Sequence, residues 1–167
     1  MPKKEIIINE SKVKYRGVFD LNRVYNYLRQ WIMDAGYSDP VKEESKYAEK
    51  VKPGGKDIEI IWNSSKKEVN GYFDMSINVK FYITKMTEVE ADNEGNKLKL
   101  HKGDLWIYFT STFTMNAKSE WNEHSLMYKI YDKYIVTERR EQFKIVLYNS
   151  TNSIIKELKN FLSLYSA

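Results

Sequence analysis

The strongest constraint on the fold is a run of strict alternation from Tyr72 to Thr84. A run of 13 residues spans roughly 43 Å at about 3.3 Å per residue, so we expect a bulge, a strong twist or an overhang in this strand. A second alternating run covers 104–116. One face of each run is apolar, which predicts two strands that each present one face to a core: Phe73, Met75, Ile77, Val79, Phe81, Ile83, and Leu105, Ile107, Phe109, Phe113, Met115.

Helical spacing appears on either side of these strands. Asp20 is a good N-cap, and the apolar stripe that follows it continues to Gly36, which predicts one amphipathic helix lying against the sheet. Helical spacing returns after Ser119 and again from Phe143 to Tyr165. Residues 149–153 read NSTNS and are poor helix formers, so whether the C-terminal helix breaks there stays open.

Short turns at 52–57 and 92–96 indicate that consecutive strands pair as an antiparallel meander. We therefore predict one α+β domain over 1–167. It has a twisted antiparallel sheet of about six to seven strands, an N-terminal helix inserted after the first strand, and long C-terminal helices packed on the sheet.

This order of elements resembles the helix-grip folds, the START and polyketide-cyclase-like group, although no motif of one family is present. The resemblance implies a curved sheet around a long C-terminal helix, with a cavity between them. A small hydrophobic ligand would then touch six side chains of the apolar faces: Phe73, Ile77, Phe81, Ile107, Phe109 and Phe113. Fold likeness alone transfers no activity.

Composition excludes several kinds of chemistry. There is no cysteine, so disulfides, thiolate nucleophiles and iron–sulfur clusters are excluded. No apolar run reaches 18 residues and the N-terminus lacks a signal-peptide core, so we expect a cytoplasmic protein with no membrane contact. The net charge of +4 comes from interspersed residues, and only an N-terminal set resembles a basic patch: Lys3, Lys4, Lys12, Lys14 and Arg16.

Motifs for catalysis and metal binding are missing. The glycine pair in 52–56 falls between two strands, where a hairpin turn explains it better than a phosphate loop. The two histidines, His101 and His124, have no second ligand at metal-binding spacing. Glu88, Glu90 and Asp92 share a strand face with lysines opposite, as in a solvated charge ladder. We expect no enzyme, no cofactor and no metal.

The remaining candidate is the polar face of the long strands. It carries Trp106 and Tyr108 with a row of threonines, and the first run adds Tyr72, Tyr82 and Lys80. Three interpretations stay open: an ordinary pleated surface, a surface for a protein partner or a second copy, and a platform on which nucleic-acid bases stack.

We expect a non-enzymatic binding or assembly domain that acts through protein–protein contacts. The alternative is a helix-grip-type carrier of a small hydrophobic ligand. Weak binding of single-stranded nucleic acid comes third, because the aromatic row supplies only one basic side chain, Lys80.

Overall fold

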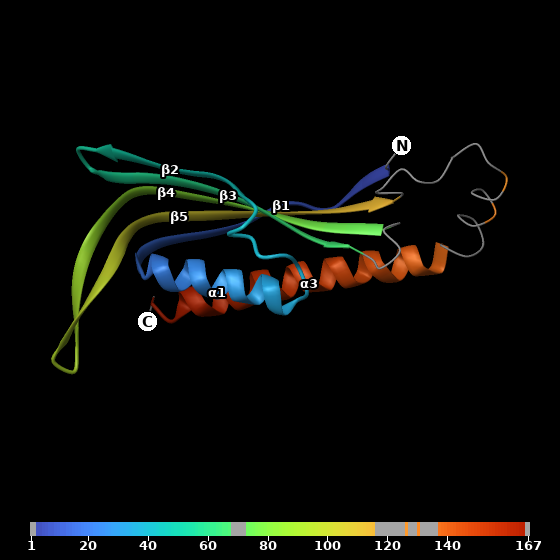
Figure 1. Cartoon of the computed structure of the whole chain (residues 1–167). Helices are drawn as coiled ribbons and strands as arrows, with labels where there is room; N and C mark the ends of the chain where they lie inside the picture. The colour runs from blue at the N-terminus through green and yellow to red at the C-terminus, as the bar shows by residue number, and fades with distance from the viewer. Residues whose placement is uncertain (1–2, 68–72, 116–125, 127–129, 131–136, 166–167) are drawn as a thin grey trace.

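A computed structural model describes residues 3–67, 73–115, 126, 130 and 137–165, and shows an α+β fold (Figure 1). The elements follow the chain in the order β1 (Lys3–Phe19), α1 (Leu21–Asp34), β2 (Glu44–Lys52), β3 (Gly55–Lys67), β4 (Phe73–Asn93), β5 (Asn96–Met115) and α3 (Thr137–Ser163). All neighbouring strands are antiparallel, and their order across the sheet is β1-β5-β4-β3-β2.

The sheet has five strands among the described residues, not the six or seven that the sequence indicated. The difference arises at the hairpin around 92–96. The segments 88–91 and 97–101 looked like separate short strands, but they are the ends of β4 and β5. Pairing between these two strands continues past a register shift between Thr84 and Thr87, so one bulged ladder replaces two hairpins.

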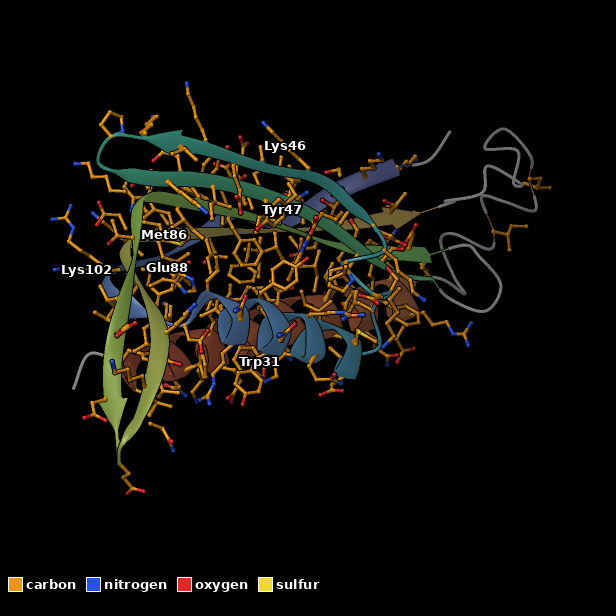
Figure 2. All side chains as sticks on the ribbon, turned by 60° about the vertical axis from the view of Figure 1, so that its left-hand side comes forward. Trp31, Lys46, Tyr47, Met86, Glu88 and Lys102 are labelled. Atoms are coloured by element: carbon orange, nitrogen blue, oxygen red, sulfur yellow. The ribbon has the colours of Figure 1, made fainter. Side chains whose placement is uncertain are left out.

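Both described helices lie on one side of the sheet, which we call the inner face (Figure 1). Helix α1 begins after Asp20, whose side chain accepts a hydrogen bond from the backbone N–H of Arg23 at 3.3 Å. Apolar side chains of both helices are buried against the strands: Leu21, Val24, Leu28, Ile32, Leu147, Ile154, Ile155, Leu158 and Leu162. Side chains fill the space between the helices and the sheet (Figure 2).

Helix α3 continues without a break through 149–153. The hydroxyl of Thr151 donates to the backbone carbonyl of Leu147 at 2.8 Å, one turn earlier, so this polar group is satisfied inside the core. Burial of Leu147, Ile154 and Leu158 on the same side holds the helix against the sheet despite the weak local propensity. The helix expected from Ser119 lies almost wholly outside the described residues.

The sheet bends sharply at the bulge of β4, and the tip of the β4–β5 hairpin turns toward the side on which the helices lie (Figure 1). Two glycines allow this bend. A Cβ at Gly55 would lie 2.8 Å from the carbonyl carbon of Lys85, and one at Gly103 would lie 2.9 Å from the carbonyl oxygen of Thr84. Only residues without a side chain let the three backbones approach this closely.

Candidate binding face of the sheet

The side of the sheet opposite the helices, here called the outer face, is covered by no element within the described residues. Alternation along β5 places Leu105, Ile107 and Phe109 on the inner face, with no exposed surface. Trp106 lies on the outer face and is 38% exposed, and Tyr82 is 36% exposed beside it. The outer face therefore presents partly exposed aromatic side chains that do not belong to the hydrophobic core.

Strand register arranges the outer face in rows across the sheet. In one row Trp106 pairs with Lys14 on β1 and with Tyr82 on β4. In the next row Tyr108 pairs with Lys12 and with Lys80. Because adjacent strands lie about 4.7–4.9 Å apart, each row brings rings and ammonium groups into contact range.

Two lysines flank the indole of Trp106. The Nζ atoms of Lys12 and Lys14 lie 5.7 Å and 5.5 Å from the centre of its ring. Such cation–π contacts contribute roughly 0.5–1 kcal/mol each at exposed sites. The indole therefore lies in a strongly cationic setting.

The two tyrosines meet edge to face. The ring centres of Tyr82 and Tyr108 are 5.8 Å apart with planes at 85°. The Tyr82 hydroxyl donates to a carboxylate oxygen of Glu59 at 3.0 Å, and this hydrogen bond is the main cause of the raised pKa of Tyr82. Lys46 donates to the other oxygen at 2.7 Å, which is the largest contribution to the lowered pKa of Glu59. These contacts fix the Tyr82 ring in place.

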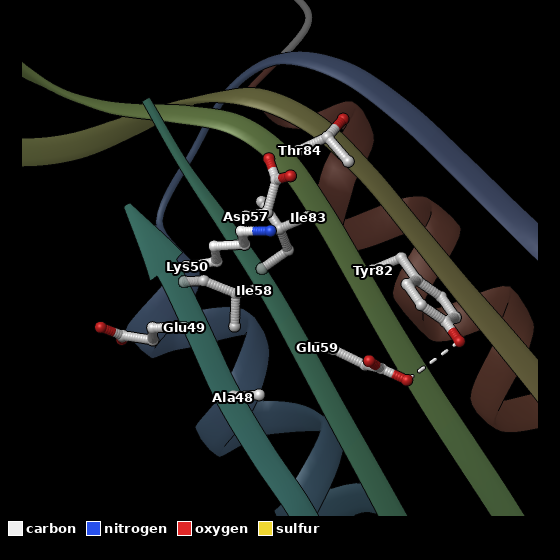
Figure 3. Close-up of a pocket in the computed structure, with 9 residues that line it drawn as sticks. All are labelled: Ala48, Glu49, Lys50, Asp57, Ile58, Glu59, Tyr82, Ile83 and Thr84. Carbon is white, nitrogen blue, oxygen red and sulfur yellow. Dashed lines mark hydrogen bonds between the residues drawn. The ribbon is translucent and has the colours of Figure 1, made fainter. Parts of the chain in front are cut away.

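A shallow hollow opens beside Tyr82, with a volume of about 330 Å³ (Figure 3). Figure 3 shows the tyrosine joined to Glu59 at its rim, with the helices behind the sheet. Side chains from β2, β3 and β4 line it: Ala48, Glu49, Lys50, Asp57, Ile58, Glu59, Tyr82, Ile83 and Thr84. The hollow is mostly apolar and adjoins the aromatic rows.

Four of the five residues proposed from sequence for binding lie together on the outer face: Trp106, Tyr108, Tyr82 and Lys80. Tyr72 lies outside the described residues. Sequence reasoning missed Lys12 and Lys14 as their neighbours, because it did not pair β1 with β5. Their alternation with Val13 and Tyr15 placed them on one strand face, but nothing local indicated which strand lay beside them.

The six side chains proposed for a ligand cavity are buried in the core. Phe73 contacts Phe113 and Phe143, with ring centres 5.3 Å apart in each pair. Phe81 packs edge to face on Trp62, at 4.8 Å between ring centres. Four surface hollows among the described residues are lined by other side chains. The carrier function and the helix-grip resemblance both stay predictions.

Chemical groups elsewhere have structural roles. The Nδ1 atom of His101 accepts the backbone N–H of Leu21 at 3.2 Å, at the start of α1. Glu44 accepts hydrogen bonds from both Tyr25 and Trp62 at 2.8 Å, next to the core. Within the described part of the chain, no group of three or more histidine and carboxylate side chains could hold a metal ion. His124 lies outside it.

The chain matches no protein-family model, and comparison with curated proteins finds no relative. None of the described helices is long and apolar enough to span a membrane.

Proposed function

We propose that the protein is a non-enzymatic binding domain that holds single-stranded nucleic acid on the outer face of its sheet. The main support for this proposal is the position of Lys12 and Lys14 beside the exposed ring of Trp106. Single-strand binders combine aromatic rings, on which bases stack, with cations along the backbone path. Sequence reasoning ranked this function third for want of nearby basic residues, and the β1–β5 pairing supplies them.

Charge on the outer face favours an anionic ligand. Lys12, Lys14 and Lys80 have no carboxylate within 4.0 Å among the described residues, whereas Lys46 and Arg16 each have one. Lys80 is attracted to Glu59 over a longer distance, since its charge is one of the smaller causes of that carboxyl's lowered pKa. Ammonium groups that no carboxylate contacts attract phosphates and release condensed counterions when a strand binds. Packing the same face against a second copy would bring like charges together instead.

Stacking of a base on Trp106 would offset the loss of its two lysine contacts, which together contribute about 1–2 kcal/mol. A base stacked on an aromatic ring contributes about 1–3 kcal/mol, and each exposed cation–π contact about 0.5–1 kcal/mol. A base that displaces the lysines from Trp106 leaves their flexible side chains free to reach the flanking phosphates. The threonines at 110, 112 and 114 offer hydroxyl groups further along the same strand face.

The test is a fluorescence-anisotropy titration with a labelled 12-nucleotide oligothymidine and with a duplex of equal length, at low salt. We expect preference for the single strand, and a loss of about 5- to 150-fold in affinity for Trp106→Ala, which corresponds to about 1–3 kcal/mol. Tyr27→Ala is the control, since Tyr27 is an exposed aromatic residue on α1. Absence of binding at low salt, or equal losses in both variants, would contradict the proposal.

Assembly through protein contacts is the second candidate. It is favoured by exposed apolar side chains on α3, where Ile145, Val146 and Tyr148 are 58%, 43% and 52% exposed. Aromatic and aliphatic groups of this kind are common at interfaces. Light scattering after size exclusion tests it: we expect a dimer that Ile145→Lys converts to monomer, and a monomer at all concentrations would speak against self-assembly.

A further inference from the structure

A second hollow lies at the bend of the sheet, at one end of the outer face. We call it the bend hollow. Its volume is about 490 Å³, and its lining comes from β1, β4, β5 and the β2–β3 turn: Arg16, Gly17, Gly54, Lys85, Thr87, Lys102, Gly103 and Asp104. Figure 2 shows Lys102 at the bend, extending away from the helices.

Cationic groups dominate this hollow. Arg16, Lys85 and Lys102 come from three different strands, and three of the eight lining residues are glycines. The carboxylate of Asp104 accepts a hydrogen bond from Nε of Arg16 at 2.8 Å, so its charge is already matched. Lys85 and Lys102 have no carboxylate within 4.0 Å among the described residues. Two unmatched ammonium groups on one concave surface favour a bound anion.

The backbone of the hollow is strained and held in place. Lys85 has a φ of +55°, in the left-handed region that residues with a side chain rarely adopt. Its N–H donates to Asp57 at 3.2 Å, and the close approach of Gly55 and Gly103 leaves the segment little room to relax. Strained residues kept by their surroundings are concentrated at ligand sites. The bulge therefore holds the backbone of Lys85 in one conformation.

The hollow continues the cationic row of the outer face. Arg16, Lys14 and Lys12 alternate along β1 on the same side, so successive members lie about 6.6–6.8 Å apart. Asp104 pairs with Arg16 just as Trp106 pairs with Lys14. A strand that stacks a base on Trp106 and follows this row toward Arg16 would reach the bend hollow within a few nucleotides.

We propose that the bend hollow is a binding site for a phosphate group, supplied by the terminal phosphate of a strand on the outer face or by a free phosphate. The strand as source rests on the proposed function, but the anion site does not. Guanidinium and ammonium groups form charge-assisted hydrogen bonds with phosphate oxygens. Among the lining glycines, Gly54 leaves space for a tetrahedral group to approach the backbone, since nothing lies within 4 Å of where its Cβ would be.

The experiment compares oligothymidines that carry a 5′-phosphate, a 3′-phosphate or no terminal phosphate, by anisotropy, and adds inorganic pyrophosphate by calorimetry. We expect one terminal phosphate to tighten binding roughly tenfold. The variant with Lys85→Gln and Lys102→Gln should lose this gain and keep its affinity for the unphosphorylated strand. Lys159→Gln, an exposed lysine on α3, is the control. Circular dichroism checks that each variant is folded.

The possible results test the phosphate site and the source of the phosphate separately. A phosphate-dependent gain that disappears in the lysine variant supports the site with the strand as its source. Pyrophosphate binding that disappears in the same variant, without any oligonucleotide binding, supports a site for free phosphate and contradicts the proposed function. Equal affinity for all three oligonucleotides together with no pyrophosphate binding overturns the bend hollow as a phosphate site, while the outer-face proposal stands.

Discussion

The two faces of β5 carry the same backbone in opposite environments. On the inner face Ile107 and Phe109 have no exposed surface and pack under the helices. On the outer face Trp106 and Tyr108 meet side chains of neighbouring strands instead, and Trp106 keeps more than a third of its surface exposed. Burial makes the first set important for folding, and exposure leaves the second set available for binding.

Stability and ligand affinity should therefore depend on opposite faces of β5. Substitutions on the inner face should change the free energy of unfolding, and substitutions on the outer face should change ligand affinity. If substitutions on both faces changed stability and affinity to the same extent, the protein would have no separate binding surface.

The largest effect is expected on the inner face. Phe109→Ala removes a fully buried ring and should lower the free energy of unfolding by about 3–5 kcal/mol, because it leaves a cavity under the helices. Trp106→Ala should lower it by only about 1–2 kcal/mol, because the main loss is its two cation–π contacts with Lys12 and Lys14. Urea denaturation measures both. Similar losses in the two variants would show that the outer face contributes to the core as well.

The bend gives the next effect, through two adjacent glycines. Gly55→Ala should destabilise the fold by about 1–3 kcal/mol, because its Cβ would meet Lys85 and Met86 at 2.8 Å and its φ is +138°. Gly54→Ala is the control, since nothing lies within 4 Å of its Cβ. Thermal unfolding compares them. Equal melting temperatures for the two variants would mean that the backbone at the bend can shift to accept a side chain at Gly55 without loss of stability.

The third prediction concerns charge on the outer face alone. Replacing Lys12 and Lys14 by glutamine should reduce the slope of log affinity against log salt by about 0.7 for each lysine that contacts a phosphate. The free energy of unfolding should fall by about 1–2 kcal/mol, because the variant loses both cation–π contacts to Trp106. Anisotropy at several salt concentrations measures the slope. An unchanged slope would remove these lysines from the binding surface.

The smallest effect concerns Glu59, whose pKa is held below its usual value of 4.5 chiefly by the hydrogen bond from Lys46. A depressed pKa stabilises the folded state above the unfolded value, and this contribution is lost as the pH falls through the folded pKa. Stability should therefore decline slightly below about pH 4.5, and Glu59→Gln should reduce that decline. Denaturation curves between pH 3 and 7 measure it, and identical pH profiles would contradict the assignment.

Local pattern was sufficient to assign the faces of β4 and β5, because alternation with a period of two fixes which side chains point inward. It was not sufficient for the strand count, since the bulge at Lys85 looks like the end of a strand when only neighbouring residues are considered. Helix α3 passes through 149–153 because tertiary burial outweighs weak propensity. The basic residues beside Trp106 were missed for a related reason: pairing between distant strands leaves little trace in either segment.

That distant pairing also affects when the proposed binding surface can form. Arg16 and Asp104 are 88 residues apart in sequence, and the whole β1–β5 ladder closes loops of similar length. Contacts of such high contact order form slowly. During synthesis, β1 must wait for β5 to emerge before the cationic row meets the aromatic one. A nascent chain therefore cannot form the proposed binding surface until all five described strands have been made, so ligand binding on this face would report on completed folding.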